Sequence, residues 1–245
     1  MASGPAETTQ SASGSDAMSL SRPAQTRQSR VRQKEGVIVS AAREIFIANG
    51  YARTTMAMIA REAGVADGTL YTYFENKDAL ARGVISDFYA RLTESAQLGV
   101  DARKTTRQKL EFLARNHIEL VMEEYGILEM LPILTSSLSE YSGSDIYTLN
   151  KHYVGVFDAI IRDGRARGDI AVESKVWMLR DIFFGALDHG AKTMMIRSNK
   201  TDTKRLIDQL VTMMLGTGAG GGSLAERMEA VAERMESALK QVEDK

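Results

Sequence analysis

The chain has 245 residues, and its 31 lysines and arginines nearly balance its 32 aspartates and glutamates. It contains no cysteine, which excludes disulfide bonds and thiolate metal sites and is typical of a reducing cytoplasm. Its three histidines lie far apart without the spacing of metal ligands, and no apolar run is long enough to cross a bilayer. We therefore expect a cytoplasmic globular protein that needs no metal or cofactor and does not enter a membrane.

Residues 1–30 are rich in serine, alanine, glycine and threonine. Because such a segment buries too little apolar surface to offset the conformational entropy lost on ordering, we expect a disordered arm. Five basic residues and no acidic one fall within residues 22–34. This local excess of positive charge is the electrostatic footprint typical of a nucleic-acid-binding segment.

Residues 54–73 have the pattern of two short helices joined by a tight turn. Thr54 or Thr55 can cap the first helix, because a threonine oxygen accepts the free amide hydrogens of an opening turn. Gly64 follows where that helix ends, at a position that favours a left-handed backbone. The pattern predicts a helix-turn-helix DNA reader, although two core helices of any all-α domain also fit it.

The pattern lies within residues 32–80, which closely resemble the N-terminal domain of the TetR family of transcriptional regulators. The matching elements, in order and without gaps, are AAREIF, NGY, TTMAMIAREAGV, GTLYTYF and NKDAL. The resemblance implies a three-helix DNA-binding domain over residues 31–91, a double-stranded DNA operator, a homodimer and a place at the bacterial nucleoid. The family usually has a capping residue where this chain has Ala66, so the cap of the second helix is either missing or shifted to Asp67.

The resemblance also assigns DNA contacts to the second helix and its flanks. Side chains at the start of a reading helix reach base edges. Asp67 can accept a hydrogen bond from a cytosine amino group, or it can simply stabilise the helix dipole. Tyr73 suits a phosphate oxygen, Tyr71 is either a DNA contact or half-buried, and Lys77 is the expected phosphate clamp. The expected DNA-binding residues are Thr55, Asp67, Gly68, Thr69, Tyr71, Thr72, Tyr73 and Lys77.

Residues 92–215 show helical periodicity without strand-like alternation, so we expect an all-α fold in which a helical bundle follows the DNA-binding domain. Pro132 must start or kink a helix, because it lacks an amide donor. We assign dimerisation to the helices within residues 172–215. The expected helices after the DNA reader cover residues 77–98, 106–124, 127–137, 144–167, 172–197 and 202–215.

The segment MLRDIFFGALDH, residues 178–189, is similar to the penultimate helix of the acyl-CoA-sensing fatty-acid-degradation regulators of the same family. Its Gly185 and Ala186 also suit two helices that cross closely at a dimer interface. The similarity implies a small apolar ligand, with fatty acyl-CoA as the first candidate and a flat aromatic inducer of an efflux repressor as the second. The candidate ligand-binding residues are Tyr153, Phe157, Trp177, Arg180 and Phe184.

Residues 216–223 read as a glycine-rich linker, and residues 224–245 contain an exact seven-residue repeat. Its apolar positions alternate by four and three, which indicates a coiled-coil seam. Three heptads are marginal alone, so a pairing helix and a solvated helix both fit.

Together these features predict a ligand-responsive DNA-binding regulator, a repressor released from a palindromic operator by its ligand. The alternative of an enzyme built on the C-terminal bundle has no support in the sequence, which contains no nucleophile–base pair, no metal-ligand spacing and no phosphate-binding loop. A third possibility is a non-enzymatic interaction protein that uses the heptad tail.

Overall fold

The computed structural model describes residues 22–135, 137–197 and 202–216, and every regular element within these ranges is a helix. The all-α fold class predicted from the sequence is confirmed. None of the described helices is both long enough and apolar enough to cross a membrane. The heptad segment and all but the first residue of the glycine-rich linker lie outside the described residues.

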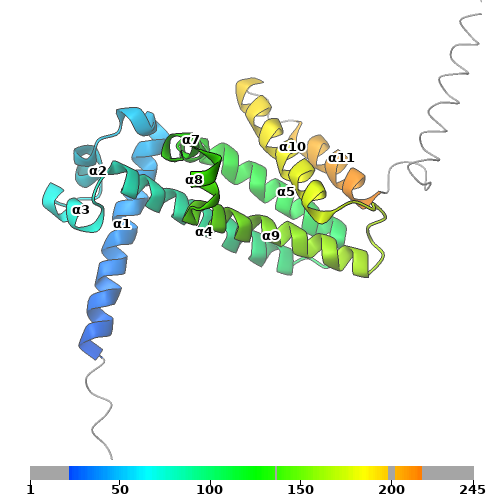
Figure 1. Ribbon diagram of the computed structural model, residues 1–245, viewed down its shortest axis with the longest axis horizontal. Coiled ribbons are helices and arrows are strands. Elements are labelled where there is room, and N and C mark those ends of the chain that lie inside the picture. The colour runs from blue at the N-terminus through cyan, green and yellow to red at the C-terminus, as the bar shows by residue number, and fades with distance from the viewer. Residues whose placement is uncertain (1–21, 136, 198–201, 217–245) are drawn as a thin grey trace, which may run out of the picture.

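Four helices build the N-terminal unit. Helix α1 packs against α2 and α4, while α2 and α3 form the helix-turn-helix at one end of the molecule (Figure 1). Helix α1 begins at Arg22, so residues 22–30 of the segment expected to be disordered are helical. The four elements are α1 (Arg22–Arg53), α2 (Met56–Glu62), α3 (Asp67–Tyr73) and α4 (Lys77–Asp101).

Seven further helices build the C-terminal unit. Figure 1 shows α4, α5 and α9 running alongside one another, with α10 and α11 along one edge of the molecule. In place of the single helix expected over residues 127–137 there are two short helices, and Pro132 lies in the first turn of the second one. The elements are α5 (Thr106–Glu123), α6 (Tyr125–Leu128), α7 (Leu131–Leu134), α8 (Leu138–Ser142), α9 (Asp145–Ala166), α10 (Val176–Arg197) and α11 (Thr203–Leu215).

Helix α4 belongs to both units. Leu80 and Val84 in its first half are buried in the N-terminal core, whereas Leu92 and Val100 in its second half are buried further along the same helix. Its second half packs against α5 and α9. The boundary predicted between residues 91 and 92 therefore falls inside a continuous helix, which can carry a displacement in one unit directly into the other.

Candidate DNA-binding surface and ligand pocket

The two threonines that precede α2 have different roles. The hydroxyl of Thr55 accepts a hydrogen bond from the Met58 amide at 3.3 Å, so Thr55 is the N-cap of α2. Thr54 is buried, and its hydroxyl donates to the Gly50 carbonyl oxygen at 2.8 Å. Gly64 has a positive φ of 64°, as a helix stop requires. Thr55 therefore stays exposed at a helix start, where a phosphate can bind.

Helix α3 presents most of the predicted DNA contacts to solvent. Asp67, Gly68, Tyr71 and Thr72 are exposed, while Thr69 and Tyr73 are half-buried. Leu70, on the opposite side, is fully buried and anchors the helix to the core. No side chain caps α3 at Ala66, so the cap is missing, one of the two possibilities left open by the sequence.

Lys77 is held inside the N-terminal unit. Its ammonium donates to the carbonyl oxygens of Tyr51 and Thr54, both at 3.0 Å, and lies 4.2 Å from the centre of the Tyr51 ring. The Tyr51 hydroxyl donates to Asp78, and burial followed by this hydrogen bond raises the pKa of Tyr51 to about 12. An ammonium has three N–H donors, so one remains for a phosphate. Lys77 thus fixes the start of α4 against the end of α1 and the residues before α2.

A buried carboxylate joins α1, α4 and the α5–α6 junction. Glu124 is 3% exposed and accepts two hydrogen bonds from the Arg91 guanidinium, at 2.7 and 2.8 Å. Arg43 of α1 lies 3.4 Å from the same carboxylate. The hydrogen bonds with Glu124 raise the pKa of Arg91 above its usual range. Because α6 begins at the next residue, this ion cluster ties α6 to the DNA-binding unit.

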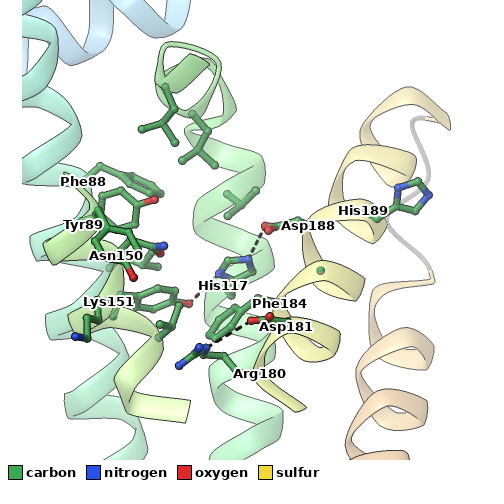
Figure 2. Close-up of a pocket in the computed structure, with 18 of the residues that line it drawn as sticks. Phe88, Tyr89, His117, Asn150, Lys151, Arg180, Asp181, Phe184, Asp188 and His189 are labelled. Atoms are coloured by element: carbon green, nitrogen blue, oxygen red, sulfur yellow. Dashed lines mark hydrogen bonds and ion pairs between the residues drawn. The ribbon is translucent and has the colours of Figure 1, made fainter. Parts of the chain in front are cut away.

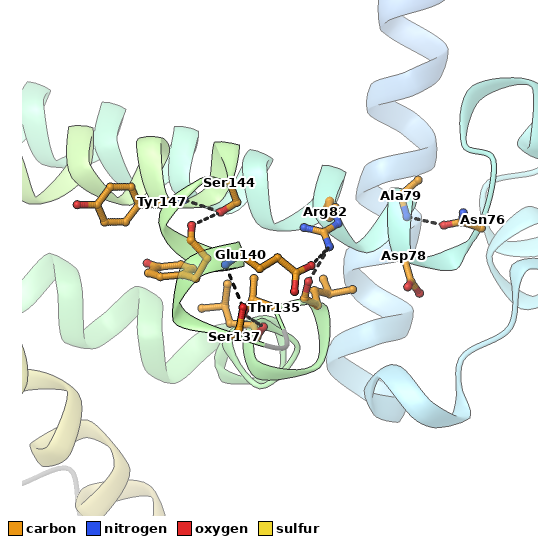
Figure 3. A network of polar contacts seen from close by, with 12 residues as sticks. Asn76, Asp78, Ala79, Arg82, Thr135, Ser137, Glu140, Ser144 and Tyr147 are labelled. Carbon is orange, nitrogen blue, oxygen red and sulfur yellow. Dashed lines mark hydrogen bonds and ion pairs between the residues drawn. The ribbon is translucent and has the colours of Figure 1, made fainter.

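Two further contacts connect the units. A Cβ atom built on Gly126 of α6 would lie 3.3 Å from the Cα atom of Ile47, so α6 touches the backbone of α1 closely. On the other side, Arg82 of α4 donates to the Leu134 carbonyl oxygen at 2.6 Å and lies 3.8 Å from Glu140 (Figure 3). The segment from α6 to α8 is therefore fastened to both α1 and α4.

A pocket of about 820 Å³ opens between α4, α5, α9 and α10, with α6 and α7 closing one side (Figure 2). Three of the five candidate ligand residues, Tyr153, Arg180 and Phe184, line this pocket. Its lining is mostly apolar or aromatic along α4 to α7 and polar along α10. The remaining lining residues are Phe88, Tyr89, Leu92, His117, Val121, Tyr125, Leu128, Leu131, Tyr147, Asn150, Lys151, Val154, Asp181, Gly185, Asp188, His189 and Lys192.

Two candidate ligand residues lie elsewhere. Phe157 is fully buried in the core, with its ring centre 4.7 Å from that of Phe183. Trp177 is 52% exposed near the start of α10, outside the pocket lining. The structure therefore does not bring these two candidates together with the other three, because α9 turns Phe157 into the core and α10 turns Trp177 outward.

A buried histidine forms the polar floor of the pocket. Nδ1 of His117 lies 2.8 Å from the Tyr153 hydroxyl, and Nε2 lies 2.8 Å from Oδ1 of Asp188 (Figure 2). The assignment that satisfies both contacts has Tyr153 donating to Nδ1 and Nε2–H donating to the carboxylate. Burial raises the pKa of Tyr153 well above its usual value, so this hydroxyl keeps its proton at neutral pH.

Charges of both signs surround the pocket mouth. Arg180 is paired with Asp158 at 2.9 Å and lies 3.6 Å from Asp181. Lys151 of α9 and Lys192 of α10 are exposed lining residues, and within the described ranges neither forms an ion pair. These two ammonium groups are available to an anionic ligand group. Among the described residues no group of three or more His, Asp or Glu side chains is placed to hold a metal ion.

The outer face of α10 and α11 exposes apolar side chains. Met178, Ile182 and Ile196 follow one another at helical spacing on α10 with exposures of 43, 50 and 76%. Gly185 lies in the same stripe, and a Cβ atom built on it would meet nothing within 4 Å. Met213 of α11 adds a fourth exposed apolar side chain. On α10 this face is apolar at both ends, while the polar His189 and Lys192, which line the pocket, lie between Ile182 and Ile196. Exposed apolar side chains that gather on one face are typical of a protein interface.

Comparison with known proteins agrees with this architecture. Residues 38–84 match the family model for bacterial regulatory proteins of the tetR family, and residues 87–217 match the model for the C-terminal region of YsiA-like proteins. The fatty acid metabolism regulator protein of Bacillus subtilis is 27% identical over 186 residues, covering 75% of this chain and 95% of that protein. The transcriptional repressor KstR2 of Rhodococcus jostii is 28% identical over 153 residues, covering 59% of this chain and 73% of the repressor.

Solved structures show the same fold. The regulator FadR of Bacillus subtilis, in a crystal structure with stearoyl-CoA, superposes with a TM-score of 0.63 at 26% identity, covering 73% of this chain and 96% of FadR. FadR of Bacillus halodurans gives a TM-score of 0.63 at 22% identity, covering 78% of this chain and 97% of that one. These relatives are regulators rather than enzymes. The chain belongs to the TetR family of bacterial regulatory proteins and has a YsiA-like C-terminal region.

Proposed function

We propose that this TetR-family protein is a repressor that leaves its operator when a long-chain acyl-CoA fills the pocket between α4, α5, α9 and α10. The observation that carries the proposal is the pocket of about 820 Å³, apolar on one side and with two exposed lysines at its mouth. The relative that holds stearoyl-CoA supports this ligand class.

The chemistry of the pocket suits both parts of such a ligand. Phe88, Leu92 and Leu128 offer an apolar wall to an acyl chain, which gains roughly 0.8 kcal/mol for each methylene removed from water. Lys151 and Lys192 offer positive charge to the phosphates of the coenzyme. A pocket with apolar walls and a few placed polar groups is the usual form of a small-molecule site.

The aromatic-inducer alternative loses support. It needed Trp177, Tyr153 and Phe157 to hold a flat ligand, and of these only Tyr153 lines the pocket. The unpaired lysines at the mouth also favour an anion over a neutral or cationic aromatic compound.

The protein acts as a dimer through the exposed apolar face of α10 and α11. Gly185 allows a second helix to approach closely at the middle of this face. A dimer presents two copies of α3 to two half-sites, roughly 34 to 36 Å apart along DNA. One helix-turn-helix alone buries too little surface for tight specific binding.

Helix α6 carries the signal from the pocket to the DNA-binding unit. Tyr125 and Leu128 line the pocket, whereas Glu124 and Gly126, beside them in the chain, contact Arg43 and Ile47 of α1. A ligand that displaces Tyr125 and Leu128 therefore also displaces Glu124 and Gly126. The resulting shift of α1 and α4 changes the separation of the two α3 helices and favours release.

Calorimetry with CoA thioesters from butyryl to stearoyl tests the ligand class. We expect affinity to rise with chain length until the pocket is full, because each added methylene leaves water. Free CoA is the control and should bind far more weakly than the long-chain thioesters. No binding of any acyl-CoA at micromolar concentration would contradict the proposal and leave the aromatic inducer as the better candidate.

A further inference from the structure

The first part of α1 extends beyond the DNA-binding unit as a separate arm (Figure 1). Residues 29–37 are all exposed, and Ile38 is the first buried residue of the helix. The family model also begins at residue 38. At a rise of 1.5 Å per residue, the segment from Arg22 to Ile38 reaches about 24 Å from the core.

The charge of the arm contrasts with that of the DNA-reading region. Residues 53–78, which contain α2, α3 and the start of α4, have three basic and four acidic residues, a net charge of −1. Residues 22–37, which form the arm, have five basic residues and one acidic residue, a net charge of +4. Phosphate neutralisation supplies much of the affinity of DNA-binding proteins, and the reading region has little positive charge to offer.

Three cations of the arm, whose side chains the structure describes, have no partner within the described part of the chain. Arg30, Arg32 and Lys34 are exposed and form neither a hydrogen bond nor an ion pair there. Arg30 and Lys34 lie one turn apart, a spacing at which like charges destabilise a helix. A helix without tertiary contacts is itself marginal in water. The arm is therefore an unpartnered cationic surface that a polyanion would stabilise.

We propose that residues 22–37 form a helical DNA-binding arm that lies along the phosphate backbone beside the half-site read by α3. The partner is the operator duplex outside the bases that α3 contacts. The arm supplies electrostatic affinity, and α3 supplies sequence selection. The inference rests on operator binding by the N-terminal unit and is independent of the ligand of the pocket.

The test uses the full chain with Arg30→Gln, Arg32→Gln and Lys34→Gln combined. Glutamine keeps the helix propensity and removes three positive charges. The matched control combines Lys104→Gln, Arg115→Gln and Arg162→Gln, which also remove three positive charges. These three side chains are exposed in the C-terminal unit and form no ion pair among the described residues. Thermal unfolding should be nearly unchanged in both variants, because all six side chains are exposed.

Affinity is measured by fluorescence anisotropy between about 50 and 200 mM salt, on a duplex selected from a random pool. For the arm variant, we expect weaker binding and a slope of log affinity against log salt that is flatter by about 0.9 per lost contact, up to about 5 for a dimer. The control variant should keep the slope of the unmodified protein. Equal slopes for the arm and control variants would overturn the proposal.

A second duplex, trimmed to the two half-sites, locates the contact. If the arm contacts DNA outside the half-sites, the unmodified protein should bind the trimmed duplex more weakly than the longer one, whereas the arm variant should bind both equally. Equal loss in both proteins would overturn the placement of the arm. If the unmodified protein selects no duplex from the pool, the proposal of operator binding fails. If it selects a duplex and the arm variant binds that duplex with the same affinity and salt dependence, only the proposal for the arm fails.

Discussion

At the scale of single residues, the most heavily constrained side chain is Glu124. Its carboxylate is buried yet bonded to both nitrogens of the Arg91 fork, with Arg43 beside it. Charge-assisted, bidentate pairs of this kind are geometrically demanding, and removal of one partner leaves the other without compensation. The cluster therefore specifies how α6 sits against α1 and α4.

Glu124→Gln should lower the free energy of unfolding by about 1 to 3 kcal/mol, because Arg91 and Arg43 then lack a full counter-charge. The neighbouring Glu123 is exposed, and Glu123→Gln is the matched control, expected to change stability by less than about 0.5 kcal/mol. Urea denaturation of both variants gives the comparison. Equal stability of the two would mean that the cluster contributes little.

The sequence could predict which side chains of the helix-turn-helix are exposed, but not which residues meet at the pocket floor. Thr55, Asp67 and Tyr71 fall within one short local pattern, so their shared exposure follows from helical periodicity. His117 meets Tyr153 and Asp188 from 36 and 71 positions away. Such a contact depends on the packing of α5, α9 and α10, which a single sequence does not reveal.

At the scale of elements, α6 is a four-residue helix placed between pocket and DNA-binding unit. Its Gly126 lies close to the backbone of α1, where an added Cβ atom would be 3.3 Å from the Cα atom of Ile47. The longer helices were predictable to within a few residues from their apolar stripes and caps. Two features were not: the break into two short helices around Pro132, and the continuation of α1 through residues 22–30, where a polar composition masked a helix.

Gly126→Ala should push α6 away from α1, because the added methyl group meets backbone atoms that cannot rotate aside. We expect operator affinity to fall by about 0.5 to 2 kcal/mol without added ligand. Gly155→Ala is the control, since a Cβ atom there meets nothing within 4 Å. Anisotropy titrations of both variants with operator DNA test the coupling between the pocket and the DNA-binding unit. Unchanged operator affinity in Gly126→Ala would show that α6 does not transmit it.

At the scale of the whole molecule, the helix-turn-helix, the pocket and the proposed dimer face lie in three different regions, and α4 contributes both to the N-terminal unit and to the pocket. Helices α10 and α11 lie at one edge, whereas α2 and α3 lie at one end (Figure 1). A change in pocket shape can therefore alter the separation of two α3 helices without breaking the dimer.

Ile182→Glu should convert the dimer into a monomer, because a charge at the middle of the exposed apolar face would be buried without a partner. Ile133→Glu is the control, since Ile133 is 56% exposed on α7, away from that face. Light scattering on both variants measures the outcome. A dimer that survives Ile182→Glu, or a monomer produced by removing residues 217–245, would move the interface elsewhere.

The most direct test of the proposed function is release of a labelled operator by stearoyl-CoA, followed by anisotropy. We expect release at ligand concentrations close to the calorimetric Kd, weaker release by short-chain thioesters and none by free CoA. To shift the protein from almost fully bound to almost fully released, the ligand must prefer the released form by roughly 10⁴-fold. Binding of stearoyl-CoA that leaves operator affinity unchanged would contradict the proposal that this protein is an acyl-CoA-released repressor.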